Sequence, residues 1–283
     1  MSEGLHIRDV SAGYGPRRVL HDITLPKLQP GTITAVVGPN AAGKSTFMKV
    51  LAGLLPSGGK IVLNGEAYLQ RSPSARAKLV GYLPQSVPAG SGLLAYESVL
   101  GAYRMTSGGQ DAEPIERVFR MLDLENVALR PVSELSGGKR QLVGLAQVLV
   151  REPRLLLLDE PTSALDLRWQ IEVLRVVREA VEQRDAVALV CVHDINLAMR
   201  FCDTVAVLSE GRLLTAGPPS QAITSETLKI GWQVEARIEN CSLGYPVVLA
   251  DEPVRGETVV AMPRTKSKRR KSRSGGKAGM RDD

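Results

Sequence analysis

The chain has 283 residues, of which 43% are hydrophobic, and its mean hydropathy of -0.04 is typical of a soluble globular protein. Its length favours one substantial domain with a smaller appendage. The richest apolar stretches, 142–150 and 155–158, are far shorter than the roughly 20 residues of a transmembrane helix. The first ten residues lack the features of a signal peptide. Cys191, Cys202 and Cys241 show no CxxC spacing, which argues against a disulfide framework or a zinc site and fits a reducing cytosol.

The net charge of +6 is distributed unevenly along the chain. Residues 261–283 hold nine Lys or Arg and two Asp, so the remainder carries a net charge of −1, from 6 minus 7. The basic balance therefore describes a tail and says little about the folded body. Because 264–279 contain almost nothing apolar, we predict that 263–283 form a disordered, solvated tail. Contact of this tail with an anionic lipid surface is the alternative.

Strand-like apolar runs occur at 5–10, 32–37, 155–158, 187–192 and 204–208, and they alternate with segments of helical periodicity. This alternation predicts an α/β fold, a sheet with covering helices. Helical periodicity is read from apolar residues that recur at steps of three and four.

The strand signal is missing between about 87 and 152, while helix-like segments continue. We therefore predict a helical subdomain inserted into a main domain that spans 1–235. Two short strand-like pieces follow at 234–238 and 246–249. They predict a small C-terminal β extension over 236–262.

A glycine-rich segment, GPNAAGKST at 38–46, directly follows the strand at 32–37. It matches GxxxxGK[ST] in the strand-then-helix context that this phosphate-binding motif requires, which argues against a chance Gly-rich turn. Backbone N–H groups of such a loop point at a polyphosphate, and the following helix start favours anions. We expect Lys44 to meet the β- and γ-phosphates and Ser45 to bind Mg²⁺. The predicted ATP-binding residues are Gly38, Pro39, Asn40, Ala41, Ala42, Gly43, Lys44, Ser45 and Thr46.

A second site is predicted where four leucines, 155–158, run into Asp159 and Glu160. A buried parallel strand that ends in an acid places the carboxylate at the carboxyl edge of the sheet, where α/β folds bind ligands. We expect Asp159 to hold Mg²⁺ and Glu160 to polarise the attacking water as general base. Taken alone, the pair is better read as solvated residues at a strand end. Together with the phosphate-binding loop at Lys44, the pair is better read as a catalytic site.

The segment LSGGKRQ at 135–141 resembles the LSGGQ signature that separates ABC ATPases from other P-loop proteins. It precedes Asp159 by the short interval of this family, and PTSALD at 161–166 resembles the family's continuation after the acidic pair. The resemblance covers about 5–249. It implies an α/β fold of the P-loop NTPase type, an ABC nucleotide-binding domain with an inserted helical subdomain and an N-terminal antiparallel β portion.

The resemblance also implies that ATP is bound between two copies of the chain. Ser136 and the N–H groups of Gly137 and Gly138, at a helix start, make a second anion site that faces away from the Lys44 loop of the same subunit. A partner copy must therefore supply it, and a two-fold homodimer contains two such sites. In an isolated protein, the same residues would be read as a Ser N-cap followed by a flexible Gly pair.

Four further residues match the family pattern, and each has an ordinary alternative. Gln85 resembles the glutamine that joins the Mg²⁺ and water site to the helical subdomain; otherwise it is a turn residue. His193 resembles the switch histidine that contacts the γ-phosphate, against a purely structural role at a strand end. Tyr14 lies between two glycines where the family stacks an aromatic on adenine, rather than only occupying a turn. Asp166 resembles the aspartate near the partner's phosphate loop, and it can also cap the following helix.

Catalysis is assigned to Lys44, Gln85, Glu160 and His193. Metal binding is assigned to Ser45, Gln85 and Asp159, and contact with the partner's ATP to Ser136, Gly137, Gly138 and Asp166.

Two positions depart from the family pattern. Ala41 stands where many members have Gly, which narrows the conformational freedom of the loop, although the metal-chelate importer branch often has this Ala. Lys139 replaces the usual Gln of the signature. It leaves Ser136 and Gly138 untouched, so only minor contacts are in doubt.

Within the family, the chain is most similar to importer ATPases for iron-siderophore, haem and cobalamin, through 38–46, DEPTSALDLR at 159–168, HDINLA at 193–198 and AGPP at 216–219. This implies a peripheral subunit on the cytoplasmic face of the inner membrane. It would dock on integral membrane permease subunits, which receive cargo from a substrate-binding protein, and no specific nucleic acid is expected. The alternatives are an export ATPase and a permease-free ABC ATPase whose basic tail contacts nucleic acid or ribosomes. The second class usually carries two ATPase halves or a long coiled-coil insertion, and the sequence shows neither.

Overall fold

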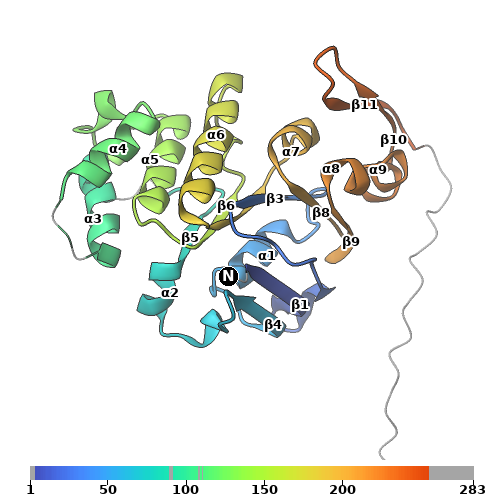
Figure 1. The fold of residues 1–283 in the computed structure, drawn as a ribbon, viewed down its shortest axis with the longest axis horizontal. Helices are drawn as coiled ribbons and strands as arrows, with labels where there is room; N and C mark the ends of the chain where they lie inside the picture. The colour runs from blue at the N-terminus through green and yellow to red at the C-terminus, as the bar shows by residue number, and fades with distance from the viewer. Residues whose placement is uncertain (1–3, 89–91, 108, 110, 255–283) are drawn as a thin grey trace, which may run out of the picture.

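The structure, a computed structural model, describes residues 4–88, 92–107, 109 and 111–254. The basic tail predicted over 263–283 lies outside the described residues. At the centre is a six-stranded sheet of order β5-β6-β7-β3-β8-β9, in which β9 alone runs antiparallel to its neighbour (Figure 1). This sheet confirms the predicted α/β class. Its strands are β3 (Thr32–Val37), β5 (Val80–Leu83), β6 (Leu155–Asp159), β7 (Val187–Cys191), β8 (Thr204–Ser209) and β9 (Arg212–Gly217).

Both faces of the central sheet are covered. Figure 1 shows α5, α6 and α7 on one side of the sheet, and α1 with β1 and β4 on the other. In the described part of the chain, no helix combines the length and the hydropathy needed to cross a bilayer. The helices are α1 (Lys44–Leu51), α2 (Pro73–Leu79), α3 (Ala95–Ser107), α4 (Glu113–Met121), α5 (Gly137–Leu149), α6 (Leu167–Arg184), α7 (Ile195–Phe201), α8 (Pro219–Ala222) and α9 (Ser225–Trp232).

The strand residues alternate between two hydrophobic cores. Leu156 and Leu158 of β6 belong to the core that includes α5 and α6, whereas Leu155 and Leu157 belong to the core that includes α1. Successive side chains of a strand point to opposite faces, so a sheet that is buried on both faces needs apolar residues at every position. This explains why the strands read as continuous apolar runs, and it fixes which residues emerge at the carboxyl edge.

A three-stranded antiparallel sheet, of order β2-β1-β4, packs against α1 and confirms the predicted N-terminal antiparallel β portion. Strand β1 (Leu5–Tyr14) is longer than the apolar run 5–10, because it continues into a tight hairpin with β2 (Arg17–Ile23). The other neighbour is β4 (Ser57–Leu63). Tyr14 therefore lies at the tip of a hairpin and not in an isolated turn.

The helices α3, α4 and α5 contact one another and lie within the range 87–152 that we predict to be helical. None of the named strands falls in the described part of that range. Phe119 of α4 and Leu142 of α5 belong to the same core as the sheet residue Leu158. The three helices are therefore packed continuously with the sheet.

A separate two-stranded hairpin, β10 (Val234–Asn240) and β11 (Pro246–Pro253), follows α9. Its Ala236, Ile238 and Val248 are half-buried against the main core. The predicted start of the extension at 236 falls inside β10, because pairing of the hairpin begins at Val234 opposite Pro253. Sequence periodicity places such a boundary only to within a few residues.

Candidate active site

The phosphate loop leaves β3 at Gly38 and enters α1 after Gly43, and both glycines have positive φ, 152° and 97°. A Cβ at Gly38 would lie 2.1 Å from the carbonyl oxygen of Leu208, and one at Gly43 would lie 2.8 Å from Cδ2 of Leu20. Real Cβ atoms do not approach this closely, so the turn needs glycine for space as well as for conformation. The sharp turn aims the start of α1 at the carboxyl edge of the sheet.

The N-terminus of α1 has no side-chain cap and no acidic residue in its first turn. Its free N–H groups and its partial positive charge suit an anion. The buried Lys44 places its ammonium group beside this helix start. Its Nζ donates to the carbonyl oxygens of Gly38 at 2.8 Å and Pro39 at 3.0 Å. These bonds hold the ammonium group within the loop that it is predicted to serve.

Ala41, the departure from the family pattern, adopts φ of 62°. This left-handed conformation costs an L-residue roughly 1–2 kcal/mol and costs glycine almost nothing. The loop therefore keeps the backbone path of a glycine at this position. The reduced conformational freedom expected from the sequence corresponds to a fixed left-handed residue.

Ser45 and Asp159 meet beside the loop. The Ser45 hydroxyl donates to Asp159 Oδ1 over 3.1 Å, and Asp159 is almost completely buried at the end of β6. Burial raises the pKa of Asp159, the hydrogen bond from Ser45 opposes that rise, and the neighbouring Glu160 carboxylate adds to it. A buried carboxylate next to a hydroxyl oxygen is a pair of oxygen ligands that a hard divalent cation would stabilise.

Glu160 is held between two other predicted site residues. Its side chain is 8% exposed, Oε2 accepts a hydrogen bond from Gln85 Nε2 over 2.7 Å, and Oε1 lies 2.6 Å from His193 Nε2. Gln85, Glu160 and His193 follow the carboxyl ends of β5, β6 and β7, which are neighbours in the sheet. The next strand, β3, leads into the phosphate loop. Four adjacent parallel strands therefore deliver their residues to one edge.

The signature turn is brought to a different place. Ser136 is the N-cap of α5, and its Oγ accepts from the backbone N of Lys139 over 3.3 Å. A Cβ at Gly138 would lie 3.0 Å from the carbonyl oxygen of Ala164, so this turn packs on the segment 161–166. Buried side chains of α5 and α1 face opposite sides of the sheet. Within the described residues, no hydrogen bond joins this turn to the Lys44 loop.

Three other predicted features have local roles in the structure. Asp166 Oδ1 accepts from the backbone N of Trp169 over 3.0 Å, which is the helix cap expected from the sequence. Lys139 donates from Nζ to the carbonyl oxygen of Asp123 over 2.7 Å and lies 5.4 Å from the Trp169 ring centroid. The lysine that departs from the signature is thus bound by its own subunit. Tyr14 is 47% exposed and available for stacking.

Sequence reasoning missed two residues that surround Asp159. Cys191 is paired with Asp159 across β6 and β7, and burial raises its pKa well above the ordinary value, with the Asp159 carboxylate as the second cause. Burial likewise raises the pKa of Tyr82, again with Asp159 as the second cause. The alternation of side chains along the strands could have revealed the cysteine, because Leu189 and Cys191 point to the same face of the sheet as Leu157 and Asp159.

Comparison with known proteins identifies the family. The sequence model of the ABC transporter family matches residues 20–163. The chain belongs to the ABC transporter family. It is 38% identical to a hemin import ATP-binding protein of Chelativorans sp. strain BNC1, over 79% of this chain and 89% of that protein. It is 34% identical to an iron(3+)-hydroxamate import ATP-binding protein of Bacillus subtilis strain 168, over 89% of this chain and 97% of that protein.

Solved structures give the same family. The ATP-binding subunit of an ABC transporter superposes with a TM-score of 0.68 at 28% identity, covering 76% of this chain and 89% of its own. An inward-facing metal-chelate type ABC transporter superposes with a TM-score of 0.72 over 87% of this chain and 97% of its own, and its 24% identity supports the fold alone. The predicted family is therefore confirmed, and this ABC family member is the ATP-binding, ATP-hydrolysing subunit of a transporter.

The geometry of the phosphate loop generates a first prediction. Gly38→Ala places a Cβ against the backbone of the central strand β8, which cannot move aside. We expect a loss of about 1–3 kcal/mol in the free energy of unfolding, as for overpacked cores, together with a large loss of ATP affinity. Chemical denaturation and nucleotide titration measure both. Gly101→Ala is the matched control, since nothing lies within 4 Å of its Cβ; equal behaviour of the two variants would contradict the steric argument.

Proposed function

We propose that the chain hydrolyses ATP at two composite sites of a homodimer and so powers a membrane permease that imports a metal chelate of the iron-siderophore, haem or cobalamin type. The observation that carries the catalytic part is the placement of Glu160 between Gln85 and His193, next to the buried Asp159 and Ser45 pair. A carboxylate with two oriented partners, beside a phosphate-binding loop, is the arrangement required for in-line attack by a positioned water.

Each side chain has a separate task in this proposal. Lys44 and the start of α1 hold the phosphates, and Glu160 orients the attacking water and accepts its proton. Ser45 and Asp159 would hold Mg²⁺ through their oxygens. Gln85 would add its amide oxygen as a further ligand of Mg²⁺, because its Nε2 already donates a hydrogen bond to Glu160. The cation, when bound, neutralises charge on the β- and γ-phosphates. His193 touches Glu160 and would contact the γ-phosphate.

The dimer is proposed because one subunit holds only half of the contacts. Ser136, Gly137 and Gly138 start a helix on the face of the sheet opposite α1, and they would complete the site of the partner. Their N–H groups at a helix start favour the γ-phosphate. Asp166 would lie at the same seam, and Tyr14 would stack on adenine. ATP then joins the two subunits, and hydrolysis releases them.

The cargo class rests on the relatives, which are named as hemin import, iron(3+)-hydroxamate import and probable siderophore transport ATP-binding proteins. An ATPase subunit does not touch the cargo, so its own residues carry no direct trace of it. Import places the subunit on the cytoplasmic face of the inner membrane, as a peripheral partner of integral permease subunits, with a substrate-binding protein acting indirectly.

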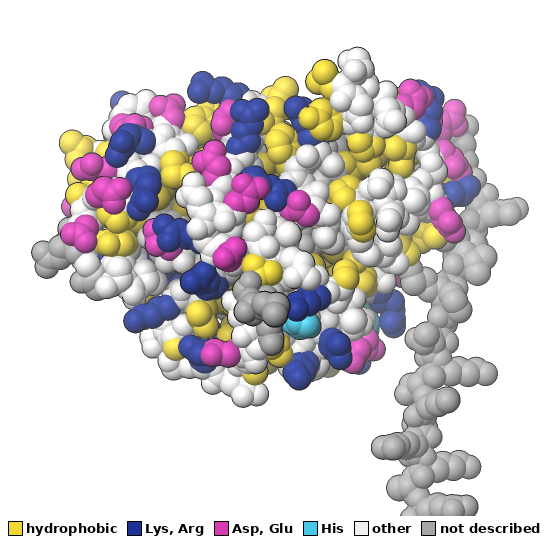
Figure 2. All heavy atoms as spheres, viewed as in Figure 1, with side chains coloured by type: hydrophobic (Ala, Val, Ile, Leu, Met, Phe, Trp, Pro, Cys, Tyr) yellow, Lys and Arg dark blue, Asp and Glu magenta, His cyan; other side chains and the backbone are white. Residues whose placement is uncertain are grey.

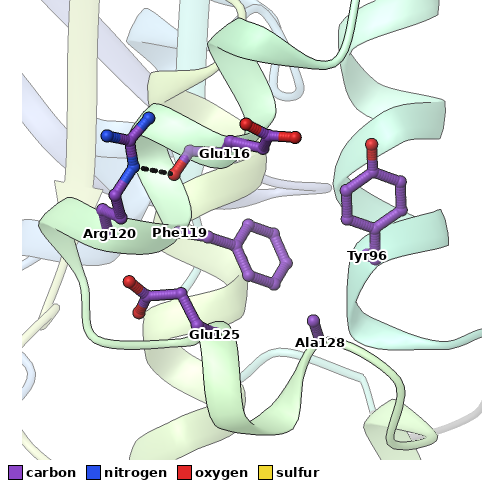
Figure 3. Close-up of a pocket in the computed structure, with 6 residues that line it drawn as sticks. All are labelled: Tyr96, Glu116, Phe119, Arg120, Glu125 and Ala128. Carbon is purple, nitrogen blue, oxygen red and sulfur yellow. Dashed lines mark hydrogen bonds between the residues drawn. The ribbon is translucent and has the colours of Figure 1, made fainter.

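The helical region offers a docking surface for such a permease. A hollow of about 310 Å³ lies among the helices of this region. In Figure 3 the ring of Phe119 lies between the other lining residues and faces Tyr96. The two rings are 5.9 Å apart between centroids. Glu116 and Glu125 place carboxylates at its rim. Beside Ala128, which lines the hollow, Leu129 is 78% exposed. Arg120 also lines the hollow, so its rim carries charges of both signs. An apolar floor with a charged rim suits a short permease helix that carries apolar and polar side chains.

A second candidate is a permease-free ABC ATPase that acts on nucleic acid or ribosomes. On the face drawn in Figure 2, Lys and Arg side chains are interspersed with Asp and Glu. Such a face does not make the continuous basic patch that nucleic acid requires. The relatives, which are named as import ATP-binding proteins, make transport the better supported proposal.

The catalytic assignment predicts the behaviour of Glu160→Gln. The amide keeps the size of the side chain but cannot accept a proton, so turnover should fall by about 10²-fold or more, while ATP binding and ATP-dependent dimerisation persist. Steady-state phosphate release and gel filtration with ATP measure the two properties. Turnover at the wild-type rate in this variant would refute the role of Glu160.

The shared site predicts the behaviour of Ser136→Arg. A bulky cation at the α5 start should block closure on the partner's nucleotide and abolish turnover, while nucleotide affinity of the monomer stays close to wild type, because Lys44 is untouched. Fluorescent-nucleotide titration of the monomer and an ATPase assay separate the two effects. Equal loss of affinity and turnover would show that Ser136 acts within its own subunit.

The docking surface predicts the behaviour of Leu129→Asp when the subunit is purified from detergent with its permease. A charge buried in an apolar contact should reduce recovery of the complex about tenfold or more. Leu243→Asp is a matched control, since Leu243 is 74% exposed and lies in the C-terminal hairpin. Loss of the complex in both variants would contradict the proposed surface, and recovery of nucleic acid in place of a permease would favour the second candidate.

A further inference from the structure

We propose that the C-terminal hairpin β10–β11 positions His193 for catalysis, and that Asn196 is the residue through which it does so. The proposal rests on the catalytic role assigned to His193 above. It concerns a part of the chain that contacts neither the phosphate loop nor the signature turn through any hydrogen bond of the described residues.

His193 has few means of holding its orientation. Its side chain is 49% exposed, and its described polar partner is Glu160. The residue lies between the end of β7 and Asp194, the N-cap of α7. Asp194 Oδ1 accepts from the backbone N of Asn196 over 2.8 Å and of Leu197 over 3.1 Å. The direction of the histidine is therefore set by the first turn of α7.

Helix α7 cannot fix that first turn alone. It has seven residues, far fewer than the roughly 12–15 that an isolated helix needs in water. Burial of Leu197, Ala198 and Met199 holds its inner face. At its end, Arg178 donates to the carbonyl oxygen of Phe201 over 2.8 Å. These contacts lie on the core side and at the last turn, so the outer side of the first turn needs another partner.

The hairpin supplies that partner through a paired contact. The backbone N of Val248 donates to Asn196 Oδ1 over 2.7 Å, and Asn196 Nδ2 donates to the carbonyl oxygen of Val248 over 3.4 Å. The side-chain amide thus pairs with the edge of β11 as a peptide group of a neighbouring strand would. One turn further along the helix, the Arg200 guanidinium lies 5.1 Å from the Tyr245 ring centroid.

The contact stabilises both partners. A two-stranded hairpin is marginal by itself in water, and this one forms a sheet separate from the central one. The Asn196 amide satisfies backbone groups at its open edge, and the hairpin in return holds the residue one helical turn after His193. Displacing the hairpin would therefore rotate or fray the first turn of α7 and move the imidazole relative to Glu160.

Two substitutions break the contact from opposite sides. Asn196→Ala removes the amide from the helix, whereas Val248→Pro removes the N–H donor from the strand and leaves Asn196 intact. Proline is tolerated at an edge-strand position whose N–H faces away from the sheet, as that of Val248 does. Asn240→Ala, in β10, is the matched control in the hairpin. Circular dichroism and thermal unfolding establish that each full-length variant is folded, and Val248→Pro carries the test should Asn196→Ala not fold.

We expect kcat for ATP hydrolysis to fall about tenfold in Asn196→Ala and Val248→Pro, since a misplacement of about 1 Å can cost a hundredfold. The KM for ATP should not change, because the Lys44 loop is untouched. Asn240→Ala should match the wild type. In single-turnover assays on a His193→Ala background, Asn196→Ala should cause no further loss, because interactions through a common residue are not additive.

The contrary results are equally specific. A wild-type kcat in Asn196→Ala, an effect confined to KM, or a further tenfold loss on the His193→Ala background would overturn the positioning role. Wild-type activity of His193→Ala itself would instead overturn the catalytic assignment of the histidine on which the proposal rests. A fall in thermal stability that is the same in both backgrounds, with kcat unchanged, would reduce Asn196 to a structural contact.

Discussion

The burial of two adjacent carboxylates is the constraint on which the rest of this structure depends. Asp159 ends a strand that is covered on both faces, Glu160 directly follows it, and water solvates neither well. Unpaired buried charges are costly, so each carboxylate needs partners at the same edge. Ser45 donates a hydrogen bond to Asp159, Gln85 donates one to Glu160, and His193 Nε2 lies against the second oxygen of Glu160. The catalytic roles proposed here fall on the same groups that make this burial tolerable.

Much of this arrangement could be predicted from the sequence because it is local. The loop at Lys44, the acidic strand end at Asp159 and the Asp166 cap each depend on residues that are close in the chain, and the apolar runs indicate buried parallel strands. The residues of the Glu160 cluster were predicted, but their mutual contacts were not. Gln85 and Glu160 are 75 positions apart, and only the strand order of the sheet makes them neighbours.

The features that could not be predicted depend on long-range packing. Nothing in the order of residues shows that Lys139 binds the Asp123 carbonyl rather than facing a partner, or that Asn196 pairs with Val248, 52 positions away. Strand β1 also extends beyond the apolar run at 5–10, because its pairing with β2 continues where its side chains are no longer buried. Periodicity reports burial, and it is silent where exposed backbone pairing or side-chain direction decides the outcome.

The Glu160 cluster also links the two ends of the molecule. Gln85 follows β5 and leads toward α3 and the hollow beside Phe119, while His193 precedes α7 and the C-terminal hairpin. Because Glu160 contacts both residues with its two oxygens, we expect a change in the nucleotide site to act on Gln85 and His193 at once. The short side chain of Glu160 can transmit such a change only if contacts with other parts of the protein hold Gln85 and His193 in place. In this proposal, the rigid attachment of α7 therefore matters as much as the chemistry of His193.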